Sequence, residues 1–233
     1  MKQIIFILFL ILGFNSYSQD INQIDAKGKR HGVWKKTFQG TDVLRYEGQF
    51  EHGKENGLFK FYKYIDKKGV LSATKDFHKD GSADVKFYSS KGKVISEGKM
   101  IDTLHIGKWI FYHNNSTKTM IEEQYNLKGK LEGERKVYYP NGNLAETQVY
   151  KNGKLNGVSK LFGEERILLN EYTYVDGLLH GPVKIYDASG QLIAEGSYKK
   201  NKQHGIWKYY ENGKLKEQKD FTPKSRNPYL KKQ

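Results

Sequence analysis

Lysine and tyrosine recur together in this sequence at a fixed spacing, and their chemistry suits ligand binding. In the segment GIWKYY at residues 205–210, a lysine stands three residues after a glycine and a tyrosine stands five residues after it. A lysine ammonium group provides a point charge for a phosphate or a carboxylate. A tyrosine ring can stack on a sugar or a lipid headgroup, and it can make cation–π contacts. The combination predicts a binding surface.

Seven further segments follow the same spacing. The glycine, or the alanine that replaces it once, stands at positions 32, 57, 83, 107, 133, 157, 181 and 205, so each step is 24 to 26 residues long. Lysine is missing only from the fourth segment, where Ile110 replaces it. Tyrosine is missing from the first segment, which has Thr37, and from the sixth, which has Phe162. The candidate ligand surface consists of Lys35, Lys60, Lys86, Lys136, Lys160, Lys184, Lys208, Tyr62, Tyr88, Tyr112, Tyr138, Tyr186 and Tyr210.

These lysines and tyrosines also have a purely structural explanation. Lysines on a solvated sheet discourage association between sheets, and tyrosines stabilise a sheet by packing across strands. Five glutamates recur three residues before the residue that ends a segment: Glu47, Glu97, Glu122, Glu171 and Glu195. Ion pairs between these glutamates and the lysines would lower the free positive charge, so both explanations stay open.

Residues suited to catalysis or metal binding do not form a recognisable pattern. His31, His180 and His204 immediately precede the repeated glycine. Adjacent hairpins would place them roughly 10 Å apart, too far to share one ion, and turn capping explains them instead. The sequence has no helical zinc-protease histidine pair, no Gly-x-Ser-x-Gly segment and no phosphate-binding loop. We therefore predict no catalytic residues, no metal site, no cofactor and no enzyme activity.

Each segment predicts a β-hairpin that positions these side chains. The first strand, such as residues 206–210, is rich in aromatic residues, and dipeptides such as Asn212-Gly213 follow it. Asparagine and glycine supply the positive φ that a tight hairpin turn requires. No window shows sustained helical periodicity. Alternation along the strand places the residues two and four positions after the glycine, such as Trp109 and Phe111, on a buried face opposite the lysines.

The clearest copies of the segment, YKNGKLNG at residues 150–157 and the stretch 201–216, resemble the MORN-repeat variant of bacterial proteins, the type found in the YwqK-like antitoxin family. The resemblance extends over residues 26–221. It implies an all-β fold: tandem β-hairpin repeats forming an elongated, twisted, single-layer antiparallel sheet, an open MORN-like array. It implies no catalytic residues, and it implies lipid binding, protein scaffolding or toxin neutralisation as functions. Ala83, Ile110, Arg135 and Ser159 depart from the repeat.

The termini predict four parts of the chain: a signal peptide at residues 1–18, an N-terminal linker at 19–25, eight repeats at 26–221 and a basic C-terminal tail at 222–233. A positive residue, an apolar run over residues 4–14 and small residues at Ser16 and Ser18 are typical of a cleaved secretion signal. The apolar run is much shorter than the ~20 residues of a membrane-spanning helix. We therefore expect an exported protein, periplasmic or secreted, whose mature chain begins at Gln19.

The composition narrows the range of partners. The formal net charge is +14, and there are no cysteines, which excludes disulfides and thiolate chemistry. A basic chain often binds nucleic acid, but export makes nucleic acid an unsuitable partner. We expect an interaction scaffold or recognition surface for another protein. Two alternatives stay open: a binder of anionic lipid or glycan of the cell envelope through the lysines and tyrosines, and an antitoxin or immunity-type inhibitor.

Overall fold

The computed structural model describes residues 20–223. The expected signal peptide, its cleavage site and most of the expected basic tail lie outside these residues. All regular structure in the described part of the chain is β-strand. The strands are β1 (Gln23–Ile24), β2 (Arg30–Thr37), β3 (Leu44–Glu51), β4 (Lys54–Ile65), β5 (Lys68–Phe77), β6 (Ser82–Tyr88), β7 (Val94–Ile101), β8 (Leu104–Tyr112), β9 (Thr119–Tyr125), β10 (Gly133–Tyr138), β11 (Leu144–Lys151), β12 (Lys154–Leu155), β13 (Gly157–Phe162), β14 (Leu168–Val175), β15 (Leu178–Tyr186), β16 (Leu192–Lys199), β17 (Lys202–Glu211) and β18 (Lys214–Asp220).

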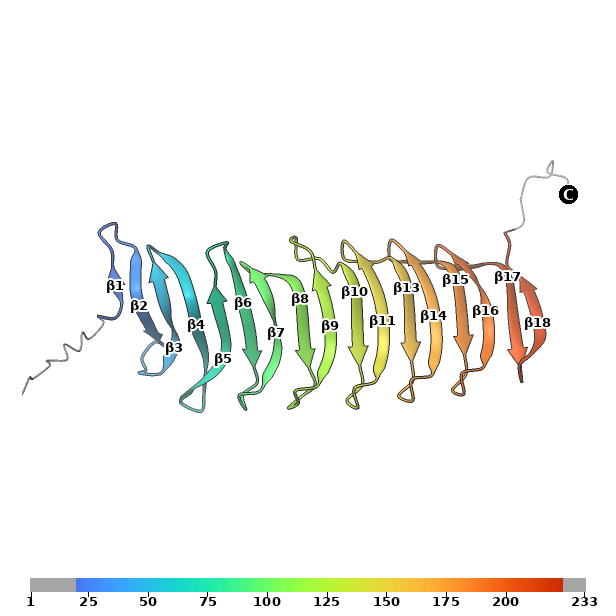
Figure 1. The fold of residues 1–233 in the computed structure, drawn as a ribbon, viewed down its shortest axis with the longest axis horizontal. Coiled ribbons are helices and arrows are strands. Elements are labelled where there is room, and N and C mark those ends of the chain that lie inside the picture. The colour runs from blue at the N-terminus through green and yellow to red at the C-terminus, as the bar shows by residue number, and fades with distance from the viewer. Residues whose placement is uncertain (1–19, 224–233) are drawn as a thin grey trace, which may run out of the picture.

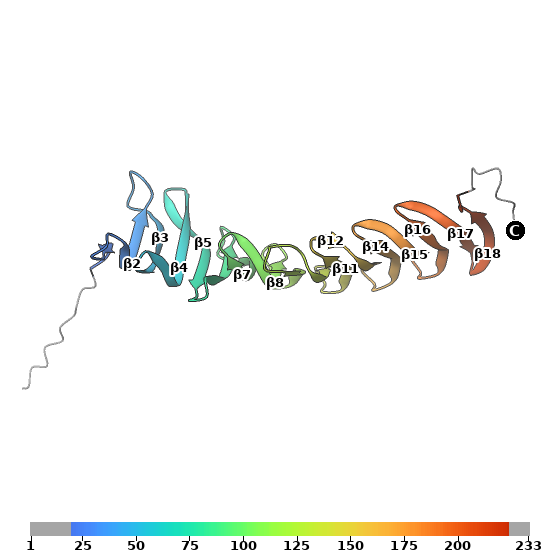
Figure 2. The ribbon, with the colours of Figure 1, turned by 90° about the horizontal axis from the view of Figure 1, so that it is seen from above.

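These strands form one open antiparallel sheet in chain order, which confirms the predicted fold class. The eight hairpins are β2–β3, β4–β5, β6–β7, β8–β9, β10–β11, β13–β14, β15–β16 and β17–β18, and we call them units 1 to 8. The units stand side by side along the long axis (Figure 1) and the sheet twists along its length (Figure 2). Strands β1 and β18 lie at opposite ends, so the sheet does not close.

The segment expected to be an N-terminal linker contains β1, which covers the first edge of the sheet. Gln23 pairs with His31 of β2. The Asn22 side-chain oxygen accepts a hydrogen bond from the Lys35 backbone N–H at 2.8 Å. The Trp34 indole donates to the Gln23 carbonyl at 2.9 Å. Backbone groups of β2 that would otherwise face solvent therefore have partners within the chain.

The turns between units add contacts that the strand pairing alone does not provide. In the turn after β11, Asn152 and Gly153 have φ values of 50° and 82°, the left-handed conformation that asparagine and glycine tolerate best. The Gly153 N–H donates to the Leu131 carbonyl of the preceding turn at 2.8 Å, and Gly177 donates to Leu155 in the same way. These turns thus contact the preceding ones, and the units concerned are joined at the sheet edge as well as within the sheet.

The face predicted to be buried contains the most buried rings of the protein. Phe59, Trp109 and Trp207 are 1%, 0% and 2% exposed. A glycine on the neighbouring second strand leaves room for each ring. A Cβ atom built on Gly98 would lie 2.5 Å from the Trp109 ring. These glycines, which also include Gly48 and Gly196, are required for the space they leave and not for their backbone angles.

Arg135 of unit 5 takes the position that the buried ring holds elsewhere. Its Nε lies 3.0 Å from a Glu123 carboxylate oxygen, and another guanidinium nitrogen lies 3.4 Å from Glu146 and 3.2 Å from the Gln148 amide oxygen. The polar side chains at this point of the buried face therefore satisfy one another. Unit 5 pairs through only two residues with β9, and through two residues each with β12 and β13, against five between β14 and β15.

The last strand differs from the other second strands. All seven residues of β18 are exposed. Lys219 stands opposite Trp207, although the corresponding position is glycine in units 1, 3 and 7. Glu217 stands opposite Tyr209, where units 2, 3 and 7 carry the small residues Ala73, Ser96 and Ala194. Units 2 and 5 also carry charges at these two positions, Lys75 and Glu146, and the next strand pairs with both residues. A charge at either position is therefore compatible with a further unit.

Candidate functional site

All seven candidate lysines lie in one row that crosses sixteen strands of the sheet. In each unit one residue of the first strand, a lysine in all units except unit 4, stands opposite one residue of the second strand. In units 1 to 7 that second-strand residue also pairs with the corresponding first-strand residue of the next unit. The second-strand residues are those at positions 47, 74, 97, 122, 147, 171, 195 and 218. In order, the row is Lys35, Glu47, Lys60, Thr74, Lys86, Glu97, Ile110, Glu122, Lys136, Thr147, Lys160, Glu171, Lys184, Glu195, Lys208 and Gln218. We call it the Lys–Glu row.

Most lysines of the Lys–Glu row make an ion pair. Glu47 lies between two of them, 3.7 Å from the Lys35 Nζ and 3.4 Å from the Lys60 Nζ. Further pairs are Lys86–Glu97 at 3.0 Å, Lys160–Glu171 at 3.3 Å and Lys208–Glu195 at 3.4 Å. Lys184 has no ion pair within 4.0 Å in the described chain, but it stands between Glu171 and Glu195. The row therefore carries seven lysines and five glutamates, and its charges largely cancel.

At two positions of the Lys–Glu row, the ion pair is not the one that the cross-strand register would give. Where Ile110 replaces lysine, Lys108 from two positions earlier on β8 reaches Glu122 at 3.2 Å. Lys136 pairs with Glu134 of its own strand at 3.0 Å. Sequence reasoning missed Lys108, although its position on the same side of β8 as Ile110 was a usable signal.

The tyrosines stand beside the Lys–Glu row and bond to its glutamates. The Tyr62 hydroxyl donates to Glu47 at 2.9 Å, and the Tyr210 hydroxyl donates to Glu195 at 2.7 Å. Tyr112 donates to Glu97 in the same way, and the Tyr88 hydroxyl lies 3.3 Å from that of Thr74. The described chain gives no such bond for Tyr138 or Tyr186. All six tyrosines nevertheless hold the same register position, opposite an aliphatic residue or threonine of the second strand.

These contacts shift the pKa values of several residues in and beside the row. Burial, together with the hydrogen bond to Glu47, raises the pKa of Tyr62 to about 12. The pKa of Tyr112 is raised to about 12 by burial and by its bond to Glu97. The hydrogen bond from Tyr62 lowers the pKa of Glu47, the Lys60 and Lys35 charges lower it further, and burial opposes the shift. At neutral pH Tyr62 and Tyr112 are therefore hydrogen-bond donors and Glu47 is ionised.

The histidines do not gather into a site. In residues 20–223 there is no group of three or more His, Cys, Asp or Glu side chains that could hold a metal ion. The His31 and His52 rings lie 4.9 Å apart, and His52 bonds to Asp25 at 2.7 Å. His105 was not singled out in the sequence, yet its ring stacks on Trp109 at 3.6 Å. Burial lowers the pKa of His105, which is consistent with a packing role.

Three stretches of the chain match a known family model. Residues 131–152, 179–200 and 203–222 match the model of the MORN repeat variant. They fall on the turn before unit 5 with unit 5 itself, and on units 7 and 8. None of the curated proteins matches the chain.

Among solved structures, S. aureus TarM in a mutant form, in complex with fondaparinux, alpha-GlcNAc-glycerol and UDP, is 15% identical to the chain with a TM-score of 0.21. The match covers 50% of the chain and 19% of that protein. A second structure of TarM gives 16% identity, a TM-score of 0.20 and coverage of 53% and 20%. The chain thus spans about a fifth of the length of these proteins, and similarities at this level indicate nothing about its activity. No helix among residues 20–223 has the length and apolar character needed to cross a membrane.

Proposed function

We propose that this chain is an exported, non-enzymatic repeat protein that acts as a scaffold or recognition surface for another protein. The observation that carries the proposal is the Lys–Glu row. It repeats the same few side chains at every unit on one face of an open sheet. A partner with matching periodicity, or several copies of a smaller partner, would find equivalent contacts along the array.

The electrostatics of the row favour binding over catalysis. A carboxylic acid that donates a proton in catalysis usually has a raised pKa. Hydrogen bonds from tyrosines and neighbouring lysine charges instead lower the pKa values of Glu47, Glu97 and Glu195. These carboxylates are held ionised by fixed partners, which suits a rigid surface.

Export forms part of the proposal. The charged start, the short apolar run over residues 4–14 and the small residues Ser16 and Ser18 support removal of residues 1–18. The mature chain would then act in the periplasm or outside the cell. The intact mass of the native protein tests this step, because a chain that still begins at Met1 would rule out the proposed cleavage.

Binding of anionic envelope lipid or glycan is a second candidate, favoured by two places in the row. Thr74 separates Lys60 from Lys86, and Thr147 separates Lys136 from Lys160, without a glutamate between the lysines. Ligand oxygens could contact two lysines there. These four lysines also pair with glutamates, which disfavours a long polyanion, and no observation favours toxin neutralisation.

Cross-linking of the mature chain in an envelope extract tests the scaffold function. We expect cross-links from lysines of the Lys–Glu row to one or a few proteins, lost when the same extract is treated with protease first. Cross-links spread evenly over turn lysines, or none above a scrambled control, would contradict a specific scaffold role.

A further inference from the structure

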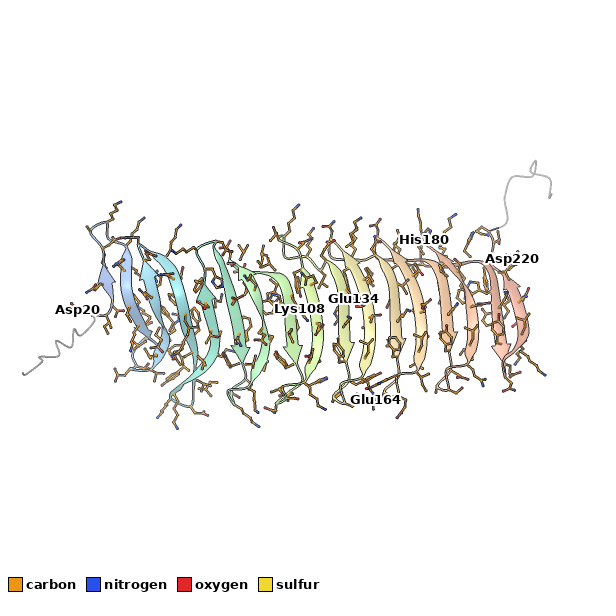
Figure 3. The ribbon with its side chains drawn as sticks, in the orientation of Figure 1. Asp20, Lys108, Glu134, Glu164, His180 and Asp220 are labelled. Carbon is orange, nitrogen blue, oxygen red and sulfur yellow. The ribbon has the colours of Figure 1, made fainter. Side chains whose placement is uncertain are left out.

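A groove lies on the same face as the Lys–Glu row, beside units 2 to 4. It has a volume of about 640 Å³ and runs across β5 to β8. Leu58, Asp76, Asp84, Lys99 and Lys108 line one side of it, and we call these five residues the outer row. Figure 3 shows Lys108 near the middle of the array. Thr74, Lys86 and Glu97 of the Lys–Glu row line the other side.

In the outer row, charges of the same sign are neighbours and do not alternate from strand to strand. Asp76 of β5 stands directly opposite Asp84 of β6, and Asp84 stands opposite Lys99 of β7. Lys108 follows on β8. Across four adjacent strands the order is therefore two negative charges and then two positive charges. Like charges directly opposite each other in a sheet are destabilising, and the neighbouring Lys–Glu row avoids this arrangement.

Contacts within the protein reduce this imbalance but leave one carboxylate unpaired. Asp76 makes no hydrogen bond or ion pair in the described chain. Asp84 bonds to His78 at 2.8 Å and pairs with Lys99 at 4.0 Å, and Lys108 pairs with Glu122 at 3.2 Å. The Lys99 and Lys108 side chains are nevertheless about half exposed, and Leu58 is 55% exposed. An unpaired carboxylate, two exposed lysines and an exposed apolar side chain are thus presented together to solvent.

We propose that this groove binds a segment of another polypeptide that crosses β5 to β8. The segment places a basic side chain over Asp76 and Asp84 and an acidic side chain over Lys99 and Lys108. The two ends are two strand spacings apart, roughly 10 Å, close to the ~10.5 Å rise between residues i and i+7 of an α-helix. An apolar residue beyond the basic one would contact Leu58. A groove with both signs of charge complements a polypeptide better than a polyanion. This inference rests on the proposed scaffold function and names the chemistry of its partner.

Selection from a displayed library of random 16-residue peptides on the full chain tests the groove. We expect enriched peptides to combine Lys or Arg with Asp or Glu at a constant separation. Their affinity should fall at least tenfold with D76N/D84N and with K99Q/K108Q. Two controls make the same changes in net charge away from the groove, D102N/D176N and K151Q/K154Q, and should keep the parent affinity.

Stability gives a second measurement. Because Asp76 faces a like charge, D76N should raise the thermal midpoint by about 1–3 °C. A lower midpoint would assign Asp76 a structural role and overturn the proposal. Failure to enrich peptides, or enriched peptides that bind all variants equally, would also overturn it. The scaffold function itself would survive those results if the cross-links to envelope proteins persist.

Discussion

Replacing Gly98 by alanine should destabilise unit 4, because the added methyl group would enter the volume of the Trp109 ring. The Cβ atom would lie 2.5 Å from ring carbons, well inside van der Waals contact. The ring cannot move away freely, since its indole N–H donates to the Lys99 carbonyl at 2.9 Å and it is 0% exposed. Overpacking costs about 1–3 kcal/mol, and loss of the hydrogen bond adds roughly 0.5–1.5 kcal/mol. We expect a total loss of about 2–4 kcal/mol.

Urea unfolding followed by tryptophan fluorescence and circular dichroism measures this loss. Gly163→Ala is the matched control, because its φ is not positive and its nearest neighbour, the Leu169 side chain, would lie 3.8 Å from the new Cβ. That control should be neutral or slightly stabilising. In a Trp109→Ala background, which itself costs about 3–5 kcal/mol, Gly98→Ala should cost almost nothing. Equal costs for Gly98→Ala in both backgrounds would refute the steric reasoning.

Three further predictions concern the row and the array. The lowered pKa of Glu97 contributes stability that is fully present above the unfolded value of about 4.3 and is lost as pH falls through the folded value. Glu97→Gln should therefore destabilise the protein at pH 7, and in thermal melts its difference from the parent should shrink as the pH falls below about 4.3. Deletion of residues 157–180 should leave a folded, shorter sheet, because each unit contacts chiefly its neighbours, and a far-ultraviolet circular dichroism spectrum of an unfolded chain would contradict this. Reversing the charge of Lys136, Lys160 and Lys184 together should lower the free energy of unfolding by less than about 1 kcal/mol per lost ion pair. If the row binds protein, the variant and the parent should sediment equally with acidic liposomes. Loss of sedimentation in the variant would favour the anionic-envelope candidate.

Much of the fold follows from periodicity within single strands. Alternation along the first strand predicted that Trp109 and Trp207 are buried, and turn dipeptides such as Asn152-Gly153 predicted where hairpins reverse. Both signals are local, because a side chain's face and a turn's φ depend on adjacent residues.

Features that depend on pairing between distant strands were harder to predict. Gly98 leaves space for the Trp109 ring only because the register between β7 and β8 places the two residues opposite each other. Patterns within a single strand do not determine that register. The same is true of the contact between Lys108 and Glu122 and of the network around Arg135. The lysines and glutamates of the candidate row were identified in the sequence, but their alternation across sixteen strands depends on bulges at several unit junctions.

The two ends of the described sheet differ, and this difference gives the array a direction. At the N-terminal end, β1 occupies the outer edge of β2. At the other end, β18 pairs with β17 alone among the strands of residues 20–223, and all seven of its residues are exposed. The charges of Lys219 and Glu217 do not block that edge, because Lys75 and Glu146 hold the equivalent positions in units 2 and 5 and the next strand still pairs there. An added strand would therefore find free backbone partners at one end of the described array and not at the other.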